Sequence, residues 1–423
     1  MLRFAPSPTG DMNITSLRIA LFNYLVAHQR KEELIVRIDD TDKQNNVEGK
    51  DQEILDTLDL FGISYSQVIY QSQNVRFHSA MALQLVHEKK AFSCFCSDEW
   101  LAKKKEEAKV ANKVYLYDDA CRSLPAELVI DNTNPFTIRI TRPDSAIVVD
   151  DKVQGKMNFE QEALDSFIIL SQTKIPTYNF SSAVDDMLND ISLVIRSEDH
   201  IDKAPIQEHI RDSLSYNKKI EYAHIPNILD NDSLSVKSLL ERGFLPEAIS
   251  NYLISIGTQA PKEIFTIAQA IEWFDLSKIS TSPAPFDMEM LKYINREHLK
   301  LLDVKELSRY VGFADAEIGE LARVYLQDVY TTRELKDKIA PIFTKRTVPE
   351  ALKESTDIIK AIIIDAPYFD QYEEFKSYIM KESALKEEIF ADALYILLTN
   401  AQDGPDIAEI YKYIKNYIGE IVK

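Results

Sequence analysis

The sequence predicts an α/β nucleotide-binding fold that carries an α+β insertion and is followed by an all-α C-terminal half. Residues 1–6 and 34–38 are apolar runs short enough for buried strands, and apolar residues recur at helical spacing between them from about Ser16. A turn over residues 6–10, which contains Pro6, Pro8 and Gly10, separates the first strand from this helix. Phosphates often bind at such a turn, although many βαβ units bind no ligand.

Further patterns divide the chain into five segments. Residues 1–75 are expected to form the first half of the α/β domain, and residues 161–215 the second half, with a buried strand over 166–170. Residues 76–160 mix charge-rich helix, turns and expected strands near 136–140 and 146–149. Residues 216–285 connect this part to residues 286–423, and apolar residues keep helical spacing from about residue 245 almost to the end of the chain.

The composition indicates a globular protein with an acidic surface. The chain has 423 residues, 45% of them hydrophobic, and 49 lysines and arginines against 68 acidic residues give a net charge of −19. This charge is of the wrong sign for non-specific nucleic-acid binding, so an RNA partner would need local basic patches. The run at 103–109 mixes both signs and is typical of a solvated helix face. Since neither a long apolar stretch nor a signal peptide is evident, we expect a cytoplasmic protein without a membrane partner.

Six motifs follow one another between Arg3 and Asn295. They read RFAPSPTG from Arg3, RIDDTD from Arg37, PTYNFSSAVDD from Pro176, VIRSEDH from Val194, RGFLPEAISNYL from Arg242, and FD from Phe286 with LKYIN from Leu291. This series resembles the motifs of the glutamyl-tRNA synthetases, which are class I aminoacyl-tRNA synthetases. The resemblance implies a Rossmann-type catalytic domain split by an insertion that holds the tRNA acceptor end (76–160), a stem-contact region (216–285) and an anticodon-binding helical domain (286–423).

The resemblance also implies a glutamate pocket. Its residues would be Arg3, Ser7, Asp39, Tyr178, Ser182 and Arg196. Fixed arginines suit a ligand carboxylate, because a guanidinium forms charge-assisted, bidentate contacts with it. Alternatively, these arginines are structural and pair with acidic residues such as Asp186.

Two departures from the family pattern affect the ATP site, which the resemblance places at Pro8, Thr9, Gly10, Asn13, Thr15 and Ser16. Where the family reads HIGG, this chain reads Asn13-Ile-Thr-Ser16, and an asparagine cannot become cationic. The family's lysine-rich loop is missing between Leu229 and Val236, so Asn13, Ser16 and Lys237 are the degenerate catalytic positions. Lys237 is either a remnant of that loop or part of the following helix.

The three cysteines have a spacing seen in zinc-containing members of the family. Cys94, Cys96 and Cys121, with Tyr117 as a fourth ligand, would hold a structural zinc ion. The alternative is three free thiols, which are common in cytosolic proteins.

Two hypotheses for the function follow. The first is an enzyme that attaches glutamate to tRNA with ATP and Mg²⁺. The second is a paralogue that keeps the glutamate pocket and tRNA binding, makes little or no adenylate, and serves in binding, sensing or assembly with other translation proteins. For either we expect a monomer whose partners are glutamate and tRNA.

Overall fold

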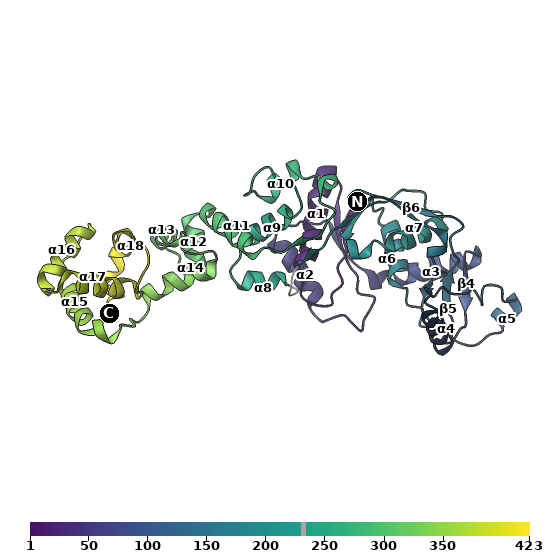
Figure 1. The fold of residues 1–423 in the computed structure, drawn as a ribbon, viewed down its shortest axis with the longest axis horizontal. Coiled ribbons are helices and arrows are strands. Elements are labelled where there is room, and N and C mark those ends of the chain that lie inside the picture. Colours follow the sequence, from purple (N-terminus) through teal and green to yellow (C-terminus); the bar gives the residue numbers. More distant parts are fainter. Residues whose placement is uncertain (230–233) are drawn as a thin grey trace. The chain divides into compact units, whose positions relative to one another are not determined.

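The computed structural model describes residues 1–229 and 234–423, which divide into two compact units (Figure 1). The first unit comprises Met1–Val236 and Leu253–Phe286, and the second comprises Lys237–Tyr252 and Asp287–Lys423. The predicted α/β part and the helical C-terminal half are both confirmed. None of the helices among these residues has the length and apolar character needed to cross a membrane.

A seven-stranded sheet forms the centre of the first unit. Its strand order is β3-β2-β1-β9-β10-β6-β7, and every neighbouring pair is parallel except β6 and β7. The strands are β1 (Leu2–Phe4), β2 (Leu34–Ile38), β3 (Gln67–Tyr70), β6 (Ile147–Asp151), β7 (Gly155–Phe159), β9 (Leu193–Ser197) and β10 (Glu221–Ile225). The chain leaves β1 toward β2 on one side and β9 toward β10 on the other, so the sheet has a switch point between β1 and β9.

Helices and short 3-10 turns connect these strands. The α-helices of the first unit are α1 (Ile14–Arg30), α2 (Lys50–Leu60), α3 (Val75–His87), α4 (Asp98–Val110), α5 (Ala126–Ile130), α6 (Tyr178–Leu188), α7 (Lys203–Ser213) and α10 (Ile267–Trp273). The 3-10 turns of the whole chain are η1 (Gln71–Asn74), η2 (Gln161–Ala163), η3 (Glu198–His200), η4 (Leu276–Lys278), η5 (Ala340–Phe343), η6 (Glu350–Leu352) and η7 (Lys415–Tyr417). Helix α1 begins two residues before the expected Ser16, because the side chain of Asn13 caps it.

A second, antiparallel sheet is made by β4 (Ala91–Cys94), β5 (Thr137–Ile140) and β8 (Ile168–Leu170). Its strands share one apolar core with α3, α6 and α7. The strand pairing near residue 160 differs from the expectation. Strands β6 and β7 lie in the segment expected to be the insertion, but they belong to the seven-stranded sheet. Strand β8 was expected in that sheet, but it pairs with β5. A short parallel pair, β11 (Ile228–Leu229) and β12 (Ala284–Pro285), completes the strands among the described residues.

The second unit is helical. It contains α11 (Met288–Leu301), α12 (Val304–Tyr310), α13 (Ala316–Tyr325), α14 (Thr332–Ile339), α15 (Lys353–Asp365), α16 (Tyr372–Ser383), α17 (Glu387–Thr399), α18 (Ile407–Ile414) and α19 (Ile418–Ile421). Helices α8 (Val236–Glu241) and α9 (Pro246–Ser255) each contain a boundary between the units. Gly319 allows α13 to lie close to α12, since a Cβ there would be 1.8 Å from the carbonyl oxygen of Val304.

Candidate functional site

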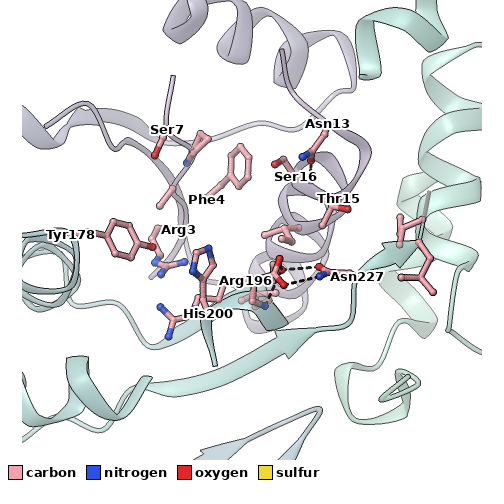
Figure 2. Close-up of a pocket in the computed structure, with 18 residues that line it drawn as sticks. Arg3, Phe4, Ser7, Asn13, Thr15, Ser16, Tyr178, Arg196, His200 and Asn227 are labelled. Atoms are coloured by element: carbon pink, nitrogen blue, oxygen red, sulfur yellow. Dashed lines mark hydrogen bonds between the residues drawn. The ribbon is translucent and has the colours of Figure 1, made fainter. Parts of the chain in front are cut away.

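A cavity of about 620 Å³ opens at the carboxyl ends of β1 and β9, where the sheet reverses its order. Ligands of open parallel sheets bind at such a switch point. The cavity brings together seven of the residues predicted for the glutamate and ATP sites: Arg3, Ser7, Asn13, Thr15, Ser16, Tyr178 and Arg196 (Figure 2). These residues come from four separate parts of the sequence, so their proximity is a product of the fold.

Arg196, on β9, is a buried guanidinium that has neutral partners. Its side chain is 6% exposed; Nε donates to Nε2 of His224 at 3.0 Å and Nη1 donates to Oε1 of Gln207 at 2.9 Å. Its Nη2 is buried and has no hydrogen-bond partner among the residues that the structure describes. Burial lowers the pKa of Arg196, but an arginine remains charged at neutral pH. A buried charge without a countercharge is costly, so this cavity is suited to an anionic ligand.

Arg3, on β1, forms part of a buried ion-pair cluster. Its Nε lies 3.2 Å from Oδ1 of Asp186, and the same oxygen lies 2.6 Å from Nη1 of Arg37. Burial alone would raise the pKa of Asp186, but the charges of Arg3 and Arg37 outweigh it and lower that pKa. The alternative that the arginines form structural ion pairs therefore holds for Nε of Arg3. Arg196, in contrast, has no ion pair with an acidic residue in the described part of the chain. Arg37 was not among the expected site residues, although it begins the RIDDTD motif.

Tyr178 and His200 line the same side of the cavity (Figure 2). Tyr178 is the first residue of α6, is 41% exposed, and its ring lies 6.0 Å from that of His200. Lys203 donates to Nδ1 of His200 at 2.7 Å. Burial, with the nearby charges of Lys203 and Arg196, lowers the pKa of His200 to about 4, so this imidazole is neutral at pH 7 and its Nε2 is a donor. His200 was not among the expected site residues, although it ends the VIRSEDH motif.

Two residues expected in the glutamate pocket do not line this cavity. Asp39 is 5% exposed and accepts two hydrogen bonds from Arg37, at 2.6 and 3.2 Å. Ser182 is 1% exposed within α6, and its buried Oγ has no hydrogen-bond partner in the described part of the chain. Asp39 instead borders an adjoining cavity, together with Ser7 and Tyr178.

The first turn of α1 forms another part of the cavity wall (Figure 2). Oδ1 of Asn13 accepts from the backbone N–H of Ser16 at 2.8 Å, so this residue is the helix N-cap. Thr15 and Ser16 line the cavity, whereas Pro8, Thr9 and Gly10 form the turn before the helix and do not.

The chain that follows β11 returns to this turn. Ser235 forms an antiparallel bridge with Asn13, the N–H of Ile14 donates to Leu234, and the N–H of Val236 donates to Met12. Residues 230–233, in the connection where the family's lysine-rich loop is expected to be missing, lie outside the described residues. Lys237 is an exposed residue of α8 in the second unit.

The three cysteines form a cluster at the end of β4, whose last residue is Cys94. Their Sγ atoms all lie within 4.8 Å of one another, and the Tyr117 hydroxyl lies 3.4 Å from Cys94 Sγ and 3.3 Å from Cys96 Sγ. Cys96 and Cys121 are 3.6 Å apart, close to the roughly 3.8 Å between sulfurs that share a tetrahedral zinc ion at 2.3 Å. Burial and the neighbouring sulfurs raise the pKa of Cys96 to about 12 in the absence of a metal. The donor set therefore fits a closed structural zinc site.

Comparisons with known proteins agree with the fold and the motifs. Residues 1–293 match the family of class I tRNA synthetases (E and Q), catalytic domain. Glutamate--tRNA ligase 2 of Sulfurimonas denitrificans is 60% identical over 432 aligned positions, and Glutamate--tRNA ligase 1 of Nitratiruptor sp. is 46% identical; both alignments cover 100% of each chain.

A solved structure supports the same fold. The crystal structure of a glutamate tRNA ligase from Elizabethkingia meningosepticum, in complex with its amino acid, superposes with a TM-score of 0.84 at 22% identity, covering 100% of this chain and 98% of that one. Together, these likenesses and the motifs show that the chain belongs to the glutamate--tRNA ligase family of class I aminoacyl-tRNA synthetases.

Proposed function

We propose that this chain binds glutamate in the cavity between β1 and β9, with the side-chain carboxylate of the ligand on Arg196. The observation that carries the proposal is the unused, buried Nη2 of that guanidinium, whose other two nitrogens contact neutral groups. Arg3 and Tyr178 adjoin the same space and supply a second cation and a phenol donor. Ser7 and His200 supply further donors to the ligand's polar groups.

We further propose that activation of glutamate with ATP and Mg²⁺ is lost or severely weakened. Asn13 already uses its amide oxygen as a helix cap and cannot carry the positive charge of a histidinium. Among the described residues that line the cavity, the lysines and arginines are Arg3 and Arg196, and neither belongs to the first turn of α1. One preorganised donor to the developing charge is worth roughly 10²–10³ in rate, so losing two would cost several orders of magnitude.

The length of the chain supports the loss of the lysine loop. Only six residues separate Leu229 from Val236, and the last two of them are tied to the turn before α1. The alignments with the relatives run over 432 positions, whereas this chain has 423 residues, so the relatives carry residues that have no counterpart here. A deletion in this connection would contribute to that difference.

We also propose that tRNA is a partner, bound by the insertion at its acceptor end and by residues 286–423 at its anticodon. The support is the family membership and the full-length coverage of the relatives. Zinc at Cys94, Cys96, Tyr117 and Cys121 would fasten the segment after β4 to the segment around Tyr117, in a structural role.

An active glutamate--tRNA ligase is the second candidate. The observation in its favour is the 60% identity, over the whole chain, with a protein named Glutamate--tRNA ligase 2. This candidate requires that another group replace the loop cation when ATP and tRNA are bound.

Glutamate-dependent exchange of pyrophosphate into ATP, with and without total tRNA, separates the two candidates. We expect exchange at background level under both conditions, together with measurable glutamate binding by calorimetry. Exchange at roughly 1–10 s⁻¹, within the general range of enzyme turnover, would establish the active ligase instead.

A further inference from the structure

Three buried polar residues form a row across the large sheet, and the first of them, Arg196, lines the cavity. Arg196 on β9, His224 on β10 and Asp151 on β6 stand on three neighbouring strands, and Arg196 is directly opposite His224 in the β9–β10 pairing. Nε of Arg196 donates to Nε2 of His224 at 3.0 Å, and Nδ1 of His224 lies 2.6 Å from Oδ2 of Asp151. The side chains of His224 and Asp151 are fully buried.

The hydrogen bonds determine which nitrogen of His224 carries its proton. Arg196 can only donate, so Nε2 must accept and Nδ1 must donate to the Asp151 carboxylate. Burial lowers the pKa of His224, which keeps the ring neutral. Asp151 is also fixed from its other side, since its Oδ1 accepts from the backbone N–H groups of Val153 and Gln154 at 2.9 and 2.8 Å.

This arrangement keeps the carboxylate of Asp151 from pairing directly with Arg196. The imidazole lies between the guanidinium and Asp151, so Arg196 receives a hydrogen bond acceptor without a direct ion pair. A direct partner carboxylate would occupy the guanidinium and neutralise it, as Asp39 and Asp186 do for Arg37. With His224 in place, Arg196 is fixed in position and its charge remains available to a ligand.

We propose that Asp151 and His224 are positioning residues that set the preference of the cavity for an anionic side chain over a neutral one of the same shape. The inference rests on the proposed glutamate site and adds the groups that make its arginine selective. Glutamine is the matching neutral ligand, because it has the size of glutamate but offers an NH₂ group where glutamate offers an oxygen.

Three substitutions test the row. In D151N the side-chain NH₂ group must face either His224 or the backbone N–H groups of Val153 and Gln154. When it faces His224, it favours the tautomer with its proton on Nε2, which cannot accept from Arg196. H224N keeps a donor near the former Nδ1, facing Asp151, and removes the acceptor for Nε of Arg196. The turn at Val153 is left intact. H224Q places an amide oxygen near the former Nε2 and is the conservative replacement.

The chain offers a matched control. His78 and Asp185 form a second fully buried pair, 2.8 Å apart, and neither residue lines the cavity. H78Q therefore measures what the loss of a buried histidine–aspartate contact does to the fold, without a change at Arg196.

The readout is the ratio of the Kd for glutamine to the Kd for glutamate, measured by calorimetry on the full chain. We expect D151N and H224N to lower this ratio roughly tenfold or more, the scale of a hydrogen bond to a charged group. H224Q should keep the ratio within about threefold of the original on the same scale, and H78Q should leave it unchanged even if the melting temperature falls.

Two contrary outcomes are distinct. If the unmodified chain prefers glutamate and both D151N and H224N retain that preference, Asp151 and His224 have a structural role only and the inference is wrong. If the unmodified chain shows no preference for glutamate, the proposed glutamate site itself is wrong and the inference is overturned with it.

Discussion

Replacing Arg196 by methionine should abolish glutamate binding without destabilising the unliganded protein. Methionine keeps much of the aliphatic volume of the arginine and removes the charge. In the free protein the substitution leaves two buried acceptors, on His224 and Gln207, without their donors, at about 1–3 kcal/mol each. It also removes a buried charge that has no acidic partner among the described residues, and the desolvation of such a charge costs several kcal/mol. These effects oppose each other, so we expect the free energy of unfolding to change little or to rise.

Thermal unfolding with and without ligand measures both effects. Glutamate at a hundredfold excess over its Kd should stabilise the original chain by about 2.7 kcal/mol, which corresponds to roughly 5–10 °C in a unit of this size. The R196M variant should show no such shift, and glutamine should shift neither protein appreciably.

Arg211 provides the control for this prediction. It is a buried arginine of the same unit whose Nη2 lies 2.6 Å from Glu208, so R211M removes the partner of an acidic group. We expect R211M to lower the unliganded melting temperature and to keep the glutamate shift. An R196M protein that loses several degrees without ligand and still responds to glutamate would refute the reasoning.

Three further predictions concern the metal and ATP sites. Protein purified without chelator should contain about one zinc ion per chain and C94S should contain less; metal-free protein of unchanged stability would contradict this. Asn13→Ala should cost about 1 kcal/mol of stability because it removes the α1 cap, whereas Asn13→Asp should be nearly neutral; equal melting temperatures for all three proteins would show that the cap is unimportant. Asn13→His alone should restore little pyrophosphate exchange. The same change should restore more when it is combined with Thr15→Gly, Ser16→Gly and a lysine-containing loop grafted between Leu229 and Val236, because the effects of groups that act as a unit are not additive. Full recovery by Asn13→His alone would mean that the loop is dispensable.

Local patterns were sufficient to predict most elements of the fold. The apolar runs at β1 and β2, the helical spacing of α1 and the helices after residue 245 depend on neighbouring residues, and the structure confirms this α/β and helical division. The pairing of β6, β7 and β8 was not predictable in this way. A short apolar strand looks the same in either sheet, and its partner is decided by contacts distant in sequence.

The same limit applies to the cavity. The motifs named Arg3, Tyr178 and Arg196, and the structure brings these residues together. The groups that hold Arg196 could not be inferred, because Asp151 and His224 are 73 residues apart and become neighbours only through the pairing of β6 with β10. The capping role of Asn13 was not among the predictions for a related reason: the family motif assigns this position to the ATP site, although asparagine is also a preferred N-cap.

A crystal structure of the chain with glutamate tests the central claim most directly. The account predicts that one oxygen of the side-chain carboxylate lies within hydrogen-bond distance of Nη2 of Arg196, while His224 keeps its contacts with Arg196 and Asp151. Glutamate bound elsewhere, or bound in the cavity with its side-chain carboxylate away from Arg196, would contradict the account.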